Sequence, residues 1–198
     1  MGDRVAKDAL FDGFAEVAKA MANGRRANTS FHLRTLATTG LVTTRREGTR
    51  IYYRLTSQRV ADLWSALRDV AAAHHAELDD LAAAYLGDRA RLEEITQAEL
   101  AERIAAGDVI VLDVRPTPEY AAGHIAGARS IPVEQLTDGL KAIPRDVDVV
   151  AYCRGPYCVM ADDAVRLLRR RGRRALRLAD GFPEWQRAQL PVEMDAAS

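Results

Sequence analysis

The sequence has little cysteine and no long apolar run. Its 198 residues include two cysteines, Cys153 and Cys158, too few for a small secreted fold held together by disulfides. No apolar stretch approaches the roughly 18 residues that cross a bilayer, and charged residues from Asp3 to Asp8 precede any apolar stretch, unlike the start of a secretory signal. We therefore expect a cytoplasmic protein with no membrane partner, whose thiols are available for chemistry.

The chain also lacks a net charge, with 28 basic and 28 acidic residues. This charge is nevertheless unevenly distributed. The segment from Lys19 to Arg54 holds eight basic residues against Glu47 alone, a local net charge of +7. Such an excess is what a phosphate-binding face requires, although a solvated basic surface explains the charge equally well by itself.

The first half of the chain is dominated by helical spacing. Its apolar and β-branched residues predict two short helices, a β-hairpin with a basic tip and one long helix, over residues 7–22, 29–39, 41–55 and 57–86. The apolar stripe of the long helix exceeds what a small domain buries by itself. We therefore expect this helix to pair two copies of the chain into a homodimer.

After a polar linker at 87–94, strands and helices alternate. The predicted helices cover residues 96–106, 118–122, 160–171 and 183–189, and the predicted strands cover 109–114, 129–131, 147–152 and 175–178. This order predicts an α/β fold with a parallel sheet flanked by helices, with its site at the carboxyl ends of the strands. The sequence thus predicts two domains, 1–88 and 91–198.

Cys153 directly follows the predicted strand 147–152 and precedes the next helix. Loop N–H groups and the helix dipole favour a thiolate in this position, so we expect Cys153 to have the lower pKa of the two cysteines and to be the nucleophile. The alternative is a buried structural cysteine. The loop Cys-Arg-Gly-Pro-Tyr-Cys is one residue shorter than the phosphate-binding loops of related phosphatases and does not end in arginine, which argues against phosphatase chemistry.

This loop lies between two further motifs, "VLDVRPTPEYAAGHIAGARSIP" (Val111 to Pro132) and "DGFPEW" (Asp180 to Trp185). Together the three resemble the signatures of rhodanese-type sulfurtransferases. The resemblance implies an enzyme without a cofactor that takes sulfur from a sulfane-sulfur donor, such as thiosulfate or a persulfide. Cys153 would carry the persulfide inside the active-site loop formed by Cys153, Arg154, Gly155, Pro156, Tyr157 and Cys158.

The resemblance also implies roles for the charged residues of these motifs. Asp113 and His124 are expected to brace the loops, and Arg154 to attract an anionic donor. Arg115 is a weaker candidate, with a surface salt bridge as its alternative. Cys158 departs from the family pattern: it either attacks the persulfide or only packs into the first turn of the following helix.

The segment "ANTSFHLRTLATTGLVTTRREGTRIYYRL", Ala27 to Leu55, resembles the recognition-helix end and wing of the ArsR family of winged helix-turn-helix repressors. The resemblance implies a mostly α N-terminal domain that binds double-stranded operator DNA. The DNA-binding candidates are Asn28, Thr29, Ser30 and His32 toward the bases, and Arg34, Arg45, Arg46 and Arg50 as further contacts. Metal sensing is not expected, because no cysteine precedes Cys153 and the adjacent His74 and His75 point in different directions.

One element of that motif is missing. A helix-turn-helix needs a helix ahead of its recognition helix, yet Arg26 runs straight into Ala27, in the middle of the expected recognition helix. By geometry the gap amounts to roughly 20 to 30 residues. Either the protein has lost the element or the printed sequence omits it; the second is favoured, because without the element the wing would have no purpose.

These observations favour a homodimeric, DNA-binding transcriptional regulator with an attached rhodanese domain that senses or transfers sulfane sulfur. The alternative is a sulfurtransferase enzyme whose N-terminal half serves only for dimerisation. Salt-dependent DNA binding distinguishes the two hypotheses, because a dimerisation module should not bind DNA.

Overall fold

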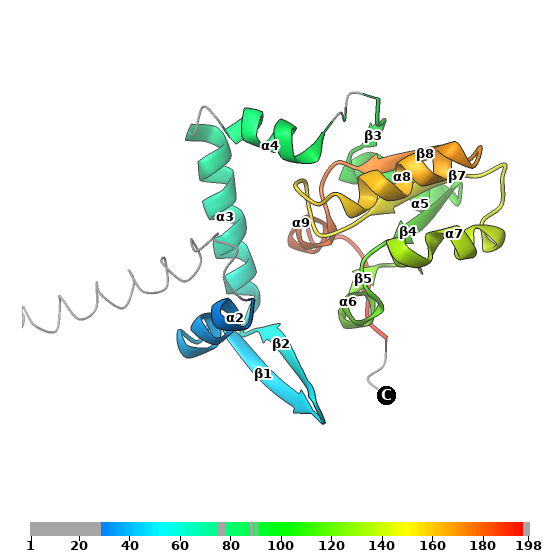
Figure 1. The fold of residues 1–198 in the computed structure, drawn as a ribbon. Helices are drawn as coiled ribbons and strands as arrows, with labels where there is room; N and C mark the ends of the chain where they lie inside the picture. Colours follow the sequence, from blue (N-terminus) through cyan, green and yellow to red (C-terminus); the bar gives the residue numbers. More distant parts are fainter. Residues whose placement is uncertain (1–28, 75–77, 88, 90, 196–198) are drawn as a thin grey trace, which may run out of the picture. The chain divides into compact units, whose positions relative to one another are not determined.

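The computed structural model describes residues 29–74, 78–87, 89 and 91–195 (Figure 1). They belong to two compact units, residues 1–76 and 77–198. The helix expected over 7–22 and the candidate Asn28 lie outside the described residues. Within the described ranges, no helix has the length and apolar character needed to cross a membrane.

The first unit contains helix α2 (Thr29–Thr38), strands β1 (Val42–Glu47) and β2 (Arg50–Leu55), and helix α3 (Gln58–His74). The expected short helix is confirmed, and it stops where the sequence indicates. Gly40 has a φ of +72°, and the N–H groups of Gly40 and Leu41 donate to the carbonyls of Ala37 and Leu36. This pattern ends a helix with a left-handed residue, a conformation that glycine adopts without strain.

The expected β-hairpin is confirmed, but its strands are longer than the sequence indicates. Val42 pairs with Leu55 and Glu47 with Arg50 in an antiparallel register, which leaves Gly48 and Thr49 as a two-residue turn. The basic residues expected at the tip therefore lie in the paired strands.

This unit has little core of its own. Among its described residues, Leu41 and Val42 are the only buried hydrophobic side chains. A unit of this size with so few buried apolar groups needs further residues or a partner for stability.

The helix expected over 57–86 is described as two helices, α3 in the first unit and α4 (Leu78–Leu86) in the second. Residues 75–77, between them, lie outside the described residues.

The second unit is built on a five-stranded sheet in the order β3-β8-β7-β4-β6. Figure 1 labels β3, β8, β7 and β4 of this sheet. Its strands are β3 (Glu94–Ile95), β4 (Val109–Asp113), β6 (Arg129–Ser130), β7 (Asp148–Tyr152) and β8 (Ala175–Leu178). Every neighbouring pair in this sheet is parallel. The predicted parallel α/β fold is thus confirmed, and β7 lies at the centre of the sheet.

Both faces of the sheet are covered, and side chains along each strand alternate between them. Leu112, Val149 and Ala151 belong to one buried cluster with α8 (Met160–Arg170), whereas Val111 and Val150 belong to the other with α5 (Gln97–Ala106). Alternation of period two buries both sides of a strand. α5 is also well defined at its start, where Thr96 and Glu99 form a reciprocal capping pair.

The remaining helices are α6 (Thr117–Ala122), α9 (Phe182–Arg187) and the short turns η1 (Val133–Gln135), α7 (Leu136–Gly139) and η2 (Leu140–Ala142). The sequence did not predict the last three, nor β3, nor the antiparallel pair β5 (His124–Ile125) and β9 (Val192–Glu193). Strands of two residues are too short for an alternating pattern to be recognised.

Candidate functional site

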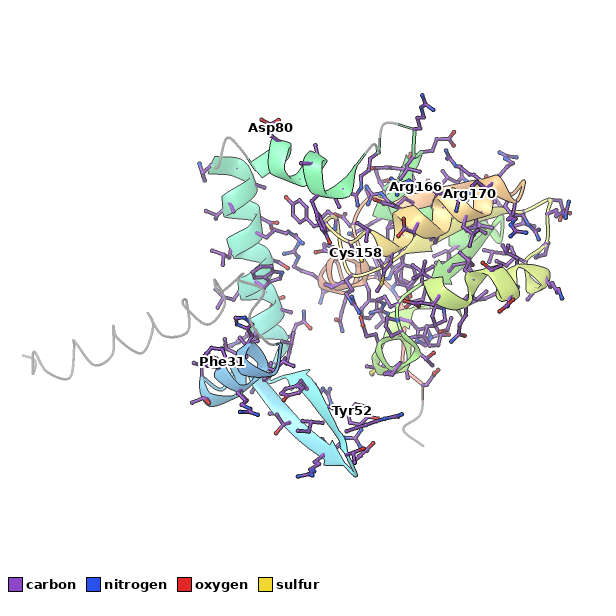
Figure 2. The ribbon with its side chains drawn as sticks, in the orientation of Figure 1. Phe31, Tyr52, Asp80, Cys158, Arg166 and Arg170 are labelled. Atoms are coloured by element: carbon purple, nitrogen blue, oxygen red, sulfur yellow. The ribbon has the colours of Figure 1, made fainter. Side chains whose placement is uncertain are left out.

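Cys153 lies where the sequence predicts, directly after the central strand β7 and ahead of α8. Its side chain is buried, at 1% exposure, and its carbonyl accepts a hydrogen bond from the N–H of Phe182. The loop turns back on itself where the N–H of Cys158 donates to the carbonyl of Gly155. Figure 2 shows Cys158 in the segment just before α8, the helix that carries Arg166 and Arg170.

The two thiols influence each other's pKa. The Sγ of Cys153 lies 3.7 Å from the carbonyl oxygen of Cys158. The hydrogen bond to Cys158, together with burial, raises the pKa of the Cys153 thiol. The hydrogen bond from Cys153 lowers the pKa of Cys158 to about 6, aided by the N–H groups of Arg154 and Met160.

The expectation that Cys153 has the lower pKa is therefore wrong for the protein in this state. That expectation considered only the loop amides and the helix dipole, and the N–H groups of Gly155 and Ala161 do lower the pKa of Cys153. Burial and the neighbouring thiol outweigh them, because a buried charge is costly and two adjacent thiolates repel. When the pair loses its first proton, the negative charge therefore lies on Cys158, beside Cys153.

The segment around Gly181 packs against the cysteine loop. A Cβ on Gly181 would lie 2.2 Å from the nitrogen of Gly155. The segment before α9 and the cysteine loop therefore touch backbone to backbone, a distance that no side chain larger than hydrogen allows.

Arg154, the candidate for attracting an anionic donor, is already ion-paired. Its guanidinium donates to both carboxylate oxygens of Glu119 in α6, with Nε at 2.9 Å from Oε2 and 3.1 Å from Oε1. The Arg154 side chain is still about half exposed, at 49%. It lies at the rim of the loop, and an anionic donor has to compete with Glu119 for it.

Asp113 and Arg115 form a buried brace beneath the loop. Asp113 is opposite Tyr152 in the sheet and accepts hydrogen bonds from the Tyr152 hydroxyl at 2.6 Å and from Arg115 Nε at 3.0 Å. Arg115 also donates to the carbonyl of Gly123 at 2.7 Å and lies over the ring of Phe182. The alternative of a surface salt bridge for Arg115 is wrong, since the residue is 4% exposed.

Two groups of this brace keep their protons near neutral pH. Burial opposes the charge on Arg115, but the hydrogen bonds and charge of Asp113 outweigh it and raise the pKa of Arg115. Burial and the adjacent Asp113 raise the pKa of Tyr152. The contacts of Arg115 and Tyr152 are therefore those of a structural support.

His124 is also buried, and it packs on Tyr120. The two rings stack with centroids 3.7 Å apart, and Nδ1 lies 2.9 Å from the carbonyl oxygen of Tyr120. Its Nε2 is 3.6 Å from a carboxylate oxygen of Glu193 in β9. These contacts join the 124–125 strand to the chain's C-terminal segment and support a bracing role.

The structure adds Arg89, a residue that the sequence analysis missed. It donates to the carbonyls of Pro156 at 2.6 Å and Cys158 at 3.1 Å, and its Nε lies 2.6 Å from Asp162 Oδ2. Asp162 is fully buried in the first turn of α8. An acidic residue on the apolar face of a helix is the one sequence signal that could have indicated a buried cationic partner.

The DNA-binding candidates are spread over α2 and the hairpin. Thr29 and Ser30 begin α2, and their side chains lie outside the described set; His32 is half-buried and Arg34 exposed. In the hairpin, Arg45 pairs with Glu47 and lies over the Tyr52 ring that Figure 2 labels, and Arg46 donates to the carbonyl of Gly48. Arg50 is exposed in β2, opposite Glu47.

The hairpin register divides these arginines between the two faces of the ribbon. Arg45 and Arg50 share one face, because their partners are Tyr52 and Glu47, and Arg46 lies on the other face opposite Ile51. The structure thus brings positive charge to both sides of one narrow β-ribbon.

Comparison with known proteins gives consistent matches for both halves. Residues 96–188 match the family model of the rhodanese-like domain. An HTH-type transcriptional regulator of Mycobacterium tuberculosis is 44% identical over 220 aligned positions, covering 98% of this chain and 96% of that protein. A sulfurtransferase of Allochromatium vinosum is 34% identical over 103 residues, covering 51% of this chain and 94% of that protein.

A solved structure of a Bacillus halodurans protein resembles the second half, with 31% identity and a TM-score of 0.50 over 52% of this chain and 77% of that chain. The alignment with the mycobacterial regulator has 220 positions, more than the 198 residues of this chain. Because it covers nearly all of both proteins, the regulator has internal residues that this chain lacks.

Proposed function

The chain belongs to a family of HTH-type transcriptional regulators and its second half is a rhodanese-like domain, and from this premise we propose that it is a DNA-binding regulator that accepts sulfane sulfur on Cys153. The observation that carries the proposal is the placement of Cys153. A buried thiol directly follows the central strand of a parallel sheet, lies 3.7 Å from the carbonyl oxygen of Cys158, and shares its loop with a second thiol.

The chemistry follows from this geometry. The thiolate of Cys153 attacks the outer sulfur of thiosulfate, the S–S bond of the donor breaks, and sulfite leaves with the bonding electrons. Cys153 then carries an anionic outer sulfur. The N–H groups of Gly155 and Ala161 favour the thiolate form of Cys153 during this attack.

Mass spectrometry of thiosulfate-treated protein tests this half of the proposal. The peptide that contains Cys153 should gain the mass of one sulfur atom, and the gain should be reversed by a reducing thiol. Unmodified protein after treatment with both thiosulfate and an organic persulfide would contradict sulfur uptake.

For the first half, we propose that α2 and the hairpin bind double-stranded operator DNA, as an ArsR-type winged helix-turn-helix domain. Positive charge on both faces of the ribbon supports this, because a wing at a minor groove meets phosphates on two sides. The internal gap in the mycobacterial alignment supports the missing segment between Arg26 and Ala27, a position outside the described residues.

We expect the affinity for a pool of random-sequence duplexes to fall steeply with salt, because each neutralised phosphate releases counterions. The triple variant Arg45→Ala, Arg46→Ala, Arg50→Ala should reduce the slope of log K against log salt by about 3, roughly 1 for each lost contact. Fluorescence anisotropy across a salt series measures both values.

The matched control removes the same charge from the second half, with Lys141→Ala, Arg145→Ala and Arg171→Ala, all exposed residues. It should keep the slope of the unaltered protein. Absence of DNA binding even at low salt would favour the alternative, a sulfurtransferase whose first half only dimerises.

We further propose that α3 forms a homodimer. Leu63, Trp64, Leu67 and Val70 recur at helical spacing and are each 45–59% exposed. Light scattering at micromolar concentration should give twice the chain mass of 21.8 kDa. Leu67→Glu should yield monomer, while Ala72→Glu, exposed on the opposite side of α3 by helical spacing, should not; a monomeric unaltered protein contradicts the dimer.

A further inference from the structure

Arg89 reaches the cysteine loop from outside the rhodanese-like domain. It lies between the end of α4 at Leu86 and the start of β3 at Glu94, ahead of the matched range 96–188. Its partners Pro156, Cys158 and Asp162 are 67 to 73 positions further along the chain. A residue of the second unit that precedes the matched range therefore holds the cysteine loop directly.

The contact set suits an arginine and no other residue. A planar guanidinium donates in fixed directions, and here it serves two carbonyls of the loop and one carboxylate at once. The side chain is 17% exposed, so these bonds are largely shielded from water. A lysine keeps the charge but cannot make all three contacts in one geometry.

Arg89 also controls the charge beside the sulfur. Asp162 is fully buried one helical turn beyond Cys158, and its carboxylate would repel an anionic sulfur in the loop. Arg89 pairs with one of its oxygens, and Arg177 Nε lies 3.4 Å from the other. The two arginines neutralise the carboxylate, which allows the loop to hold negative charge.

The carbonyl of Cys158 links these contacts to the sulfur chemistry. It lies 3.7 Å from the Sγ of Cys153 and accepts from Arg89 Nη2. When Cys153 takes up sulfur it loses its S–H, and this carbonyl keeps Arg89 as its donor. Arg89 therefore still holds the loop after the sulfur has been taken up.

We propose that Arg89 is a positioning residue for the cysteine loop: it holds the carbonyls of Pro156 and Cys158 and neutralises Asp162, so that the loop can receive sulfur on Cys153. The inference rests on the proposed sulfur chemistry of Cys153 and names a residue that supports this chemistry through the loop.

Three variants test the positioning role in the full chain. Arg89→Ala should slow sulfur uptake from thiosulfate about 10- to 100-fold, the effect of displacing a reacting group by about 1 Å. It should also move the pH profile of iodoacetamide alkylation of the cysteines to higher pH, because Asp162 is no longer neutralised. Arg89→Lys should restore the pH profile but not the full rate, and Arg91→Ala, an exposed residue of the same segment, should match the unaltered protein.

If Arg89→Ala is poorly folded because it leaves Asp162 short of a partner, Arg89→Ala/Asp162→Asn removes both charges. This double variant should retain the pH profile of the unaltered protein but take up sulfur as slowly as Arg89→Ala, because the carbonyls of Pro156 and Cys158 still lack their donor.

The inference is overturned if Arg89→Ala has the rate and pH profile of the unaltered protein, or if Arg91→Ala changes them equally. Failure of the proposed function looks different: the unaltered protein would then gain no sulfur from thiosulfate. In that case the alkylation profile of untreated Arg89→Ala still decides whether Arg89 positions the loop, and an unshifted profile rejects it.

Discussion

Cys153→Ser should abolish uptake of sulfane sulfur, with the rate of sulfite release from thiosulfate falling at least about a thousandfold, as when other covalent nucleophiles are removed. A serine hydroxyl is a far weaker nucleophile than a thiolate at neutral pH, and no second group can replace the sulfur that carries the persulfide. Sulfite release and the mass of the loop peptide measure the loss.

The variant must also be shown to fold. A hydroxyl at this buried site costs stability if it lacks a partner, on the order of 1–3 kcal/mol, so thermal unfolding should accompany the rate measurement. Cys158→Ser is the matched control. Uptake that persists in Cys153→Ser and disappears in Cys158→Ser would reassign the sulfur acceptor to Cys158, the thiol with the lower pKa.

Cys158→Ser should lengthen the life of the persulfide on Cys153 by at least about tenfold, because an attacking group held in the same loop has a high effective concentration. In the unaltered protein, the Cys158 thiolate attacks the Sγ of Cys153. The bond from Sγ to the outer sulfur breaks, sulfide leaves with its electrons, and a Cys153–Cys158 disulfide remains.

This reaction needs the Cys158 thiolate after Cys153 has lost its S–H. The N–H groups of Arg154 and Met160 and the positive charge of Arg154 then remain to lower the pKa of Cys158. Mass spectrometry over time should find sulfide release and the disulfide in the unaltered protein alone. Equal persulfide lifetimes in both proteins, with no disulfide, would leave Cys153 acting alone and Cys158 as a packing residue.

The repeating elements of the second half could be predicted from the sequence because their patterns are local. Val109–Asp113 and Asp148–Tyr152 are continuous apolar runs, and Cys153 follows the second, so both the sheet and the position of the thiol were evident. The two-residue strands Glu94–Ile95 and Val192–Glu193 were not, since their pairing is decided by distant partners.

The electrostatics of the site could not be predicted, for the same physical reason. The pKa order of Cys153 and Cys158 depends on a hydrogen bond between side chains that only the folded loop brings together. The burial of Arg115 depends on Phe182, and the role of Arg89 on carbonyls 67 or more positions away. No local pattern in a sequence encodes such contacts.

The backbone contact between Gly155 and Gly181 gives the second half an unusual point of vulnerability. Gly181 has a φ of −143°, a conformation open to any residue, so its own backbone does not require glycine. A side chain there would instead clash with the backbone nitrogen of Gly155, and the cysteine loop would have to shift away from it. Position 181 thus fixes the conformation of the cysteine loop, and a single methyl group added there would deform the loop without touching either cysteine.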